Sequence, residues 1–417
     1  MNHGSNIIAI IIITALVIGV DLYVFQGVKT LTLGWQDVKI RSYILWGYWI
    51  LSGLVLFNMF TAFWQLTVHQ NFTSFSRFAF NTFIIFFLSK FVFIIILFGE
   101  DMYRGVAGFI KLISNSGHVE EMIPGRRKFI SQAGIILAGI NFSSLVYGTI
   151  KGKYQYKLHK QTIYFPDLPD KFDGFKIIQL SDIHSGSFDN PDAVQKGIDI
   201  VKAQKADMFV FTGDIVNNKA EELIPWINHF NQIKAPYGQY SILGNHDYGD
   251  YVPWESKIAM ENNLDHLKEL HKELGYRLLL NENVDIEKDG QKISLIGVEN
   301  WGEGFVKKGD LNKAVENIDT DRFKILLSHD PSHWDEEVKD HPSNIHLTLS
   351  GHTHGMQMGI ETPKFKFSPV QFRYKNWAGL AEEKGKYLYV NRGFGFIGYS
   401  GRIGIWPEIT VLELRKG

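Results

Sequence analysis

The chain has 417 residues, which is more than one typical domain holds, so we expect at least two regions. Its formal net charge is −1, and this balance gives no electrostatic case for binding nucleic acid. The sequence contains no cysteine, which excludes disulfides, thiol nucleophiles and cysteine metal ligands.

The first region, residues 1–150, carries four long apolar segments. They are Ile7–Gln26, Tyr43–Leu66, Phe78–Phe98 and Phe129–Thr149. Each is close to the length that crosses a bilayer core of about 30 Å, and each lacks the polar stripe of a helix on a soluble protein. Trp46 and Trp64 lie towards segment ends, as in an aromatic belt. We therefore predict four transmembrane helices in a lipid bilayer.

Two charged residues interrupt these segments, Asp21 in the first and Lys90 in the third. The first and third helices would run in the same direction, so the two side chains would lie at similar depths. An ion pair between them would offset the cost of placing each charge in lipid. The alternative is that each side chain reaches the membrane surface separately.

The basic residues around the segments predict the orientation. Eight lysines and arginines lie in the two loops on one side, and five lie on the other. The positive-inside rule then places both chain ends outside. These features predict an integral protein of the bacterial inner membrane, with its C-terminal region on the periplasmic face.

A paired-arginine motif precedes the fourth segment. Arg126-Arg127-Lys128-Phe129-Ile130 resembles the core of a twin-arginine export signal, which implies the twin-arginine export machinery as a partner. Gly125 stands where that signal usually has Ser or Thr, and a plain basic flank on the cytoplasmic side is the alternative. No small-x-small cleavage site follows, so we expect the anchor to be retained.

Residues 151–173 are predicted to be a basic linker, and residues 174–417 a soluble α/β domain. Apolar runs at 175–180, 208–212 and 240–243 alternate with helical patterns, one of which is capped at Asn190-Pro191 and another of which lies near residues 221–233. This alternation indicates a mainly parallel sheet. Later strand patterns lie at 277–280, 292–298, 324–327, 345–349, 386–390 and 409–414. Two sheets packed face to face, with helices outside, account for this order.

Polar residues directly follow five of the predicted strands. The five sequences are Ser181-Asp182-Ile183-His184, Gly213-Asp214, Gly244-Asn245-His246-Asp247, Ser328-His329-Asp330 and Gly351-His352-Thr353-His354-Gly355. Side chains at the carboxyl ends of strands can point into a common crevice. Each sequence alone is compatible with an ordinary turn, but the five together predict one site.

The residue types at these strand ends point to metal ions. Carboxylate, amide and imidazole ligands without thiolate suit Mn²⁺, Fe or Zn²⁺ better than Ca²⁺. They outnumber the ligands of a single tetrahedral site, so we infer two divalent ions. Two dications about 3.5–4 Å apart repel by roughly 20 kcal/mol at an effective dielectric constant of about 20. A shared carboxylate and a hydroxide between the ions would offset that repulsion.

The order D-x-H, G-D, G-N-H-D, H and G-H-x-H resembles the calcineurin-like metallophosphoesterase superfamily over roughly residues 174–415. The resemblance implies a four-layer α-β-β-α sandwich. The metal ligands it implies are Asp182, His184 and His354 for one ion, Asn245, His329 and His352 for the other, and Asp214 as the bridge. It also implies that His246 is not a ligand but stabilises the transition state and protonates the leaving oxygen.

Departures from the family pattern bear on the substrate. Protein phosphatases of this superfamily have G-D-x-V-D-R where residues 213–218 read G-D-I-V-N-N. Asn217 can still orient His246, but it carries no charge. The arginine that grips phosphate is missing at Asn218, which argues against a phosphoprotein substrate.

The C-terminal sequence Val390-Asn391-Arg392-Gly393 resembles the bacterial membrane-associated branch of the superfamily. In that branch Gly355 is usually followed by Gly-Gln, whereas this chain has Met356-Gln357. Arg392 and Arg402 are candidates for binding a substrate phosphate, and a structural role in the sheet is the alternative.

Together these features predict a membrane-anchored hydrolase that cleaves phosphodiester or pyrophosphate bonds through a metal-bridged hydroxide. A lipid-linked or cell-envelope phosphate is the predicted substrate. A UDP-2,3-diacylglucosamine-type pyrophosphatase of lipid A synthesis is a more specific alternative, although its nucleotide-sugar substrates are cytoplasmic. A non-catalytic metal-binding scaffold, and a sensor or transporter served by the four helices, are further alternatives.

Overall fold

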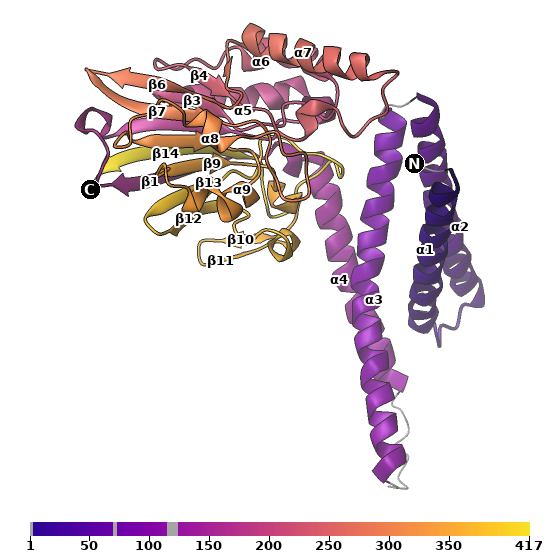
Figure 1. Ribbon diagram of the computed structural model, residues 1–417. Coiled ribbons are helices and arrows are strands. Elements are labelled where there is room, and N and C mark those ends of the chain that lie inside the picture. The colour runs from indigo at the N-terminus through magenta and orange to yellow at the C-terminus, as the bar shows by residue number, and fades with distance from the viewer. Residues whose placement is uncertain (1–2, 70–72, 115–123) are drawn as a thin grey trace. The chain divides into compact units, whose positions relative to one another are not determined.

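The computed structural model describes residues 3–69, 73–114 and 124–417 (Figure 1). The chain divides into two compact units, Met1–Tyr147 and Gly148–Gly417.

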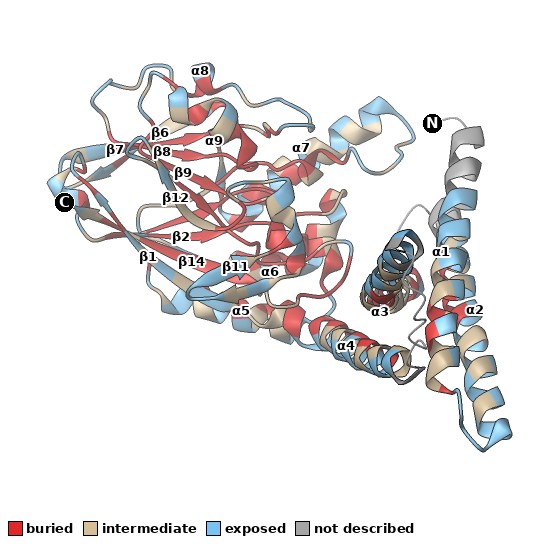
Figure 2. Cartoon of the chain, turned by 90° about the horizontal axis from the view of Figure 1, so that it is seen from below, coloured by how far each residue is buried: buried red, intermediate tan, exposed pale blue. Residues whose placement is uncertain are grey.

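The first unit is built from long apolar helices. They are α1 (His3–Leu31), α2 (Val38–His69), α3 (Ser74–Ser114) and α4 (Pro124–Ile150), the last of which ends in the second unit. The stretches apolar enough to cross a membrane are Ile11–Leu31, Val38–Gln65, Ser74–Ile110 and Arg126–Ile150. Many of their residues are exposed, and these are pale blue in Figure 2, as residues that face lipid would be. Four apolar helices are thus confirmed.

Helix α3 is longer than the predicted segment Phe78–Phe98. Its 41 residues span about 60 Å at 1.5 Å per residue, twice the thickness of a bilayer core. The extension carries Glu100 and Asp101, which lie 3.2 Å from Arg126 and 3.8 Å from Arg127 in ion pairs. A basic flank would make such contacts, and the export signal stays a prediction.

The predicted pair inside the helical unit is confirmed. Lys90 of α3 contacts the carboxylate of Asp21 of α1 in an ion pair. The same carboxylate accepts hydrogen bonds from the hydroxyls of Tyr48 at 2.7 Å and Ser52 at 2.9 Å, both on α2. One carboxylate therefore links three of the helices.

The second unit contains two six-stranded sheets. The first has the order β1 (Lys157–Phe165), β14 (Glu408–Lys416), β2 (Phe175–Leu180), β3 (Met208–Phe211), β4 (Gln239–Ser241) and β5 (Arg277–Leu278). The second has the order β12 (Gly379–Glu383), β13 (Lys386–Val390), β9 (Leu347–Ser350), β8 (Lys324–Leu327), β7 (Gln291–Gly297) and β6 (Glu282–Lys288). A separate hairpin consists of β10 (Ile360–Thr362) and β11 (Phe365–Phe367).

Helices cover the outer faces of the two sheets, which confirms the four-layer fold. Those against the first sheet are α5 (Pro191–Ala203), α6 (Ile227–Phe230) and α7 (Lys257–Leu274), and those against the second are α8 (Leu311–Ala314) and α9 (Ser332–Glu336). Helix α5 begins where the sequence predicts, because the side chain of Asn190 accepts a hydrogen bond from the Ala193 N–H at 3.0 Å.

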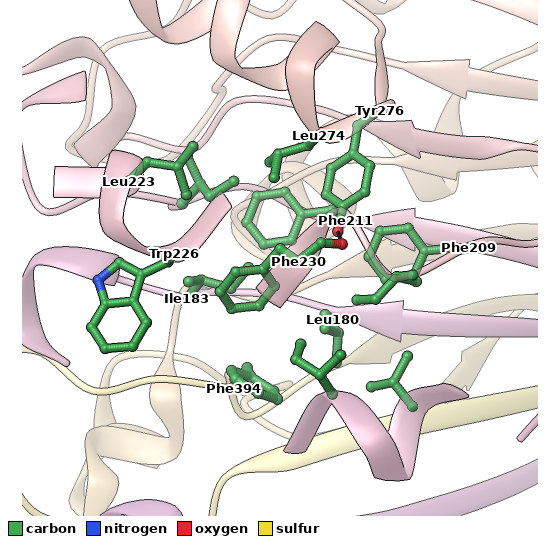
Figure 3. Close-up of a cluster of buried hydrophobic side chains, with 14 of the residues drawn as sticks. Leu180, Ile183, Phe209, Phe211, Leu223, Trp226, Phe230, Leu274, Tyr276 and Phe394 are labelled. Atoms are coloured by element: carbon green, nitrogen blue, oxygen red, sulfur yellow. Dashed lines mark hydrogen bonds between the residues drawn. The ribbon is translucent and has the colours of Figure 1, made fainter. Parts of the chain in front are cut away.

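Apolar side chains fill the space between the layers. One cluster lies between the sheets and includes Ile177, Val210 and Leu349. Another lies under α5, α6 and α7, where Phe211, Phe230 and other side chains interdigitate (Figure 3). Strands β2 and β3 are almost wholly buried because both faces of the sheet are covered. This rigid centre fixes the carboxyl ends of the strands.

Two sequence expectations differ from the structure. Residues 157–165 form β1 rather than part of a linker, and they pair in parallel with β14 along their length. This edge strand is mostly exposed, so it lacks the apolar signature of a buried strand. The helix expected near residues 221–233 is a 3₁₀ helix, Ala220–Trp226, followed by the short α6, because Pro225 interrupts it.

Candidate metal centre

The polar residues predicted to form a site follow parallel strands of both sheets. Asp182 follows β2, Asp214 follows β3 and Asn245 follows β4 in the first sheet. His329 follows β8 and His352 follows β9 in the second sheet. Because the carboxyl ends of parallel strands share one edge of a sheet, the fold brings these residues to one place.

Several of these residues have a left-handed backbone. The φ angles are 51° at Asp182, 47° at His184, 61° at Asp214, 71° at His352 and 51° at His354. Each such conformation costs about 1–3 kcal/mol for a residue other than glycine. The surrounding core holds these turns, and strained backbone of this kind is concentrated at functional sites.

The first group consists of Asp182, His184 and His354. The Nε2 atoms of the two histidines are 3.0 Å apart, and His354 Nε2 is 3.3 Å from an oxygen of Asp182. Ligands that each lie about 2.1 Å from one metal ion are roughly 3.0–3.4 Å from their neighbours. The spacing of this group fits one ion.

The second group consists of Asp214, His329 and His352, with Asn245 beside them. His352 Nδ1 is 3.3 Å from His329 Nε2 and 2.9 Å from Asn245 Oδ1. The amide nitrogen of Asn245 donates to the Tyr251 hydroxyl at 2.8 Å, so its oxygen faces the group. These spacings fit a second ion.

Asp214 lies between the two groups. Its Oδ2 atom is 3.1 Å from His329 Nε2 in the second group and 3.6 Å from His184 Nε2 in the first. Its Oδ1 atom accepts the His246 main-chain N–H at 2.8 Å. A carboxylate in this place can contact ions in both groups.

The tautomers of two histidines can be assigned from their outer hydrogen bonds. His329 Nδ1 donates to the Thr212 carbonyl at 2.7 Å, which leaves Nε2 as the inward atom. His352 Nε2 lies 2.8 Å from the Tyr374 hydroxyl and 3.4 Å from Asp330, which leaves Nδ1 inward. In the neutral form both inward nitrogens would offer a lone pair to one point, beside the carboxylate of Asp214 and the amide oxygen of Asn245, so the residues present fit a divalent cation.

Burial keeps two of these histidines neutral. It lowers the pKa of His184 to about 3 and that of His352 to about 4. Neutral imidazole is the form that binds metals. Burial would also lower the pKa of His329, but the facing carboxylate of Asp214 outweighs burial and raises it. Without a metal, a proton therefore lies between His329 and Asp214, at a point that a cation can take.

Asp247 has a positioning role that its place in the sequence motif does not predict. Its buried carboxylate accepts the N–H groups of Gly244 at 2.8 Å, Asp214 at 2.9 Å, Ile215 at 2.9 Å and Val216 at 3.3 Å. It thereby ties the turn after β3 to the turn after β4. The only feature of the sequence that points to this role is an acidic residue in a stretch that is otherwise expected to be buried.

His246 lies beside the first group, with its ring centre 4.9 Å from that of His184. Its Nδ1 atom is 2.8 Å from the main-chain carbonyl of Asn217. The side chain of Asn217 is instead hydrogen-bonded to the Ser187 hydroxyl at 3.1 Å. The prediction that the Asn217 side chain orients His246 is therefore corrected: the main chain does so.

Arg392, which the sequence predicts to bind a substrate phosphate, is held by two carboxylates. Its side chain is 4% exposed, and its guanidinium is paired with Glu408 at 2.5 Å and Glu361 at 2.5 Å. Arg402 is buried, it donates to the Gly395 carbonyl at 2.6 Å, and one of its terminal nitrogens lies 3.2 Å from His354 Nδ1. Arg402 thus supports His354, as the structural alternative holds.

Aromatic side chains border the second group. The ring of Phe305 is 4.8 Å from that of His352, and Tyr251 is 4.5 Å from the ring of His246. Trp254 donates to the Gly249 carbonyl at 2.8 Å, which indicates loop packing. Phe305 and Tyr251 therefore provide apolar surface next to the candidate ligands.

Two family models match the chain. One, "Probable Calcineurin-like phosphoesterase, transmembrane domain", matches residues 5–153, and the other, "Calcineurin-like phosphoesterase", matches residues 175–356. The chain belongs to the calcineurin-like metallophosphoesterases. This metallophosphoesterase is a membrane protein with four apolar helices, and it is a hydrolase that acts on phosphate esters.

Curated relatives of this metallophosphoesterase come from bacteria and animals. An uncharacterized metallophosphoesterase of Bacillus subtilis, YkuE, is 28% identical over 70% of this chain and 98% of its own length. The UDP-2,3-diacylglucosamine pyrophosphatase LpxG of Chlamydia muridarum is 29% identical over 59% of this chain and 86% of its own length. A transmembrane protein with a metallophosphoesterase domain from Danio rerio is 26% identical over 78% of this chain and 72% of its own length.

Proposed function

We propose that this chain hydrolyses phosphodiester or pyrophosphate bonds at a centre that holds two divalent metal ions. The observation that carries the proposal is the position of Asp214, whose Oδ2 atom lies 3.1 Å from one ligand group and 3.6 Å from the other. Shared carboxylates of this kind suit two ions about 3.5–4 Å apart.

The ligands follow from the two groups. Asp182, His184 and His354 would hold one ion, Asn245, His329 and His352 would hold the other, and Asp214 would contact both. Oxygen and imidazole ligands favour Mn²⁺, Fe or Zn²⁺. When bound, such ions supply a water of lowered pKa and polarise the phosphoryl oxygens.

His246 would protonate the leaving oxygen. Its Nδ1 atom is fixed to the Asn217 carbonyl, so Nε2 is the atom free to exchange a proton with a substrate. The side chain is only partly buried and lies beside His184, where a phosphate on the first ion would be within its reach.

The substrate class we favour is a phosphate that is linked to a membrane lipid or to a cell-envelope precursor. The four apolar helices confine the site to the vicinity of a membrane. Tyr251 and Phe305 offer apolar surface at the centre, and Asn218 stands where phosphoprotein phosphatases have an arginine. The Chlamydia relative is named as a UDP-2,3-diacylglucosamine pyrophosphatase, which supports a lipid-linked pyrophosphate as one such substrate.

The sidedness of the site separates two versions of this proposal. The charge bias of the loops favours a periplasmic site in a bacterial inner membrane. A UDP-2,3-diacylglucosamine-type activity needs a cytoplasmic site. Protease treatment of intact spheroplasts should remove the C-terminal unit if it is periplasmic, and protection of that unit would favour the nucleotide-sugar substrate.

Turnover of a generic diester tests the proposal against a metal-binding scaffold. The full chain in detergent micelles with Mn²⁺ should hydrolyse bis-p-nitrophenyl phosphate. Asp214→Asn should lower the rate by two orders of magnitude or more, roughly the loss expected when charge stabilisation in the transition state is removed. The exposed neighbour Asp250 provides a control, and Asp250→Asn should keep the rate. If the native chain shows no turnover with Mn²⁺, Fe²⁺ or Zn²⁺, hydrolysis is contradicted and a non-catalytic metal-binding scaffold is favoured.

A further inference from the structure

A cavity of about 740 Å³ lies in the second unit beside the end of α4. Strand β1, the β10–β11 hairpin and residues 404–406 contribute to its walls. The end of α4 is fixed to residues 399–402, which directly precede that last segment. The Gly148 carbonyl accepts the Arg402 N–H at 3.3 Å, and the Thr149 hydroxyl donates to the Tyr399 hydroxyl at 3.1 Å. The cavity therefore lies where the fourth apolar helix joins the soluble fold.

The walls of this cavity carry an excess of positive charge. Lys157, Lys364 and Lys366 line it together with Arg392, and Glu361 is the one carboxylate in the lining. Within the described parts of the chain, no carboxylate forms an ion pair with any of the three lysines. Lys366 Nζ donates to the Ala378 carbonyl, but no carboxylate that the structure describes neutralises the charge of any of the three lysines, so all three can attract an anionic ligand.

Arg392 offers a further donor. Its two terminal nitrogens are paired with Glu408 and Glu361, but its Nε–H is buried and has no hydrogen-bond partner among the described residues. A buried donor without a partner costs about 1–3 kcal/mol, and an acceptor oxygen in the cavity would remove that cost. Planar guanidinium groups match phosphate oxygens well.

Apolar side chains line the same cavity. Leu158 of β1 and Phe365 of the hairpin belong to its walls, and Phe365 is 58% exposed. Ile360, on the partner strand of the hairpin, is 57% exposed. Cations next to exposed apolar side chains suit a ligand with both a phosphate and hydrocarbon, whereas a free phosphate would use only the cations.

The cavity is separate from the metal centre. None of its lining residues belongs to the two candidate ligand groups. Gly393, next to Arg392, faces the centre: a side-chain carbon there would lie 3.0 Å from His354 Nδ1 and 3.0 Å from Asp182 Cβ. The short segment Arg392–Gly393 thus lies between the cavity and the metal centre. Because the two sites share no lining residue, each can be tested by its own variants.

We propose that this cavity binds the phosphate group of an anionic glycerophospholipid of the membrane. The three lysines and Arg392 contact the phosphate, and Leu158 and Phe365 contact the glycerol and the first part of the acyl chains. This binding goes beyond hydrolysis at the metal centre and does not require it.

Native mass spectrometry of the full chain tests this assignment. The protein, released from maltoside micelles after equilibration with equal amounts of phosphatidylglycerol and phosphatidylcholine, should retain phosphatidylglycerol preferentially. The triple variant Lys157→Gln/Lys364→Gln/Lys366→Gln should bind phosphatidylglycerol at least about tenfold more weakly, since each lysine near a lipid surface contributes measurably. The triple variant Lys160→Gln/Lys196→Gln/Lys205→Gln, which removes three exposed lysines outside the cavity, should bind within about twofold of the native chain.

Three results would overturn the proposal: equal retention of the two lipids, equal losses in the two triple variants, or displacement of the lipid by 10 mM inorganic phosphate. Turnover of bis-p-nitrophenyl phosphate reports that the cavity variant is folded, and Lys157→Gln alone should show a smaller loss if the triple variant does not fold. Asp214→Asn should retain the lipid. Its failure to turn over substrate is therefore distinct from a failure of lipid binding.

Discussion

His246 is held by the main-chain carbonyl of Asn217, so its orientation does not depend on the Asn217 side chain. The carbonyl of Asn217 lies 2.8 Å from His246 Nδ1 whatever side chain residue 217 carries. The orientation of the proposed acid therefore depends on the turn after β3, which the carboxylate of Asp247 fixes from below.

We expect Asn217→Ala to keep turnover within about threefold, because it removes only the contact with Ser187. His246→Gln should lower kcat by roughly 10²–10⁴, the usual range for loss of a general acid. Steady-state hydrolysis of bis-p-nitrophenyl phosphate by the two variants measures the difference. If Asn217→Ala lowers kcat as much as His246→Gln does, the side chain of Asn217 is needed to orient His246.

Met356 has a left-handed backbone with φ of 53°, and its side chain is 57% exposed. This conformation destabilises the folded chain by about 1–2 kcal/mol for a residue other than glycine. Glycine avoids that strain but destabilises the folded state by about 0.5–1 kcal/mol, because the unfolded chain gains conformational freedom. Met356→Gly should therefore raise the free energy of unfolding by up to about 1 kcal/mol, measured by thermal denaturation. Met356→Ala keeps the strain and should change little, and equal gains in both variants would show that backbone strain is not the cause.

Helix α7 carries a histidine that should make stability depend on pH. His271 is buried, and burial lowers its pKa from 6.5 to about 4. Below pH 6.5 the unfolded chain binds this proton and the folded chain does not, so stability falls as the pH drops from about 6.5 to about 4. The full effect of one such histidine is about 3 kcal/mol.

Chemical denaturation of the metal-free chain between pH 4 and 7 measures this slope. His271→Gln should lower this slope by the contribution of one histidine, while the buried His184 and His352 still contribute to it. The exposed His266 on the same helix is the matched control, and His266→Gln should leave the slope unchanged. If the native chain and both variants show the same slope, His271 is not a cause of the pH dependence of stability.

Helices α1 and α3 are joined by the pair of Asp21 and Lys90. Removing one partner of a buried pair costs about 3–5 kcal/mol because the other charge is left uncompensated. Asp21→Asn and Lys90→Met should each destabilise the helical unit, and the double variant should lose less than the sum of the two. The more accessible pair of Asp101 and Arg127, 3.8 Å apart and only partly buried, should show much weaker coupling in the same unfolding cycle.

The elements that the sequence predicts well are those with a strong apolar pattern. Strands such as β2 and β3 are buried on both faces, and their ends mark the place of Asp182 and Asp214. The exposed edge strand β1 lacks that pattern, and its partner β14 is more than 240 residues away. The pairing of Arg392 with two carboxylates is likewise a tertiary contact, which no local pattern predicts.

At the scale of the whole molecule, the chain joins four apolar helices to a soluble phosphoesterase fold. The site lies at the strand ends of both sheets, so neither sheet alone contains it. A shared cation therefore requires the two sheets to pack closely enough for Asp214 of one and His329 of the other to contact it.

Metal content is the most direct test of that claim. The full chain, saturated with Mn²⁺ and dialysed, should contain two equivalents of metal per chain by elemental mass spectrometry, and Asp214→Asn should contain at most one. Two equivalents retained by the Asp214→Asn variant, or fewer than one bound by the native chain, would contradict a centre built around a shared carboxylate.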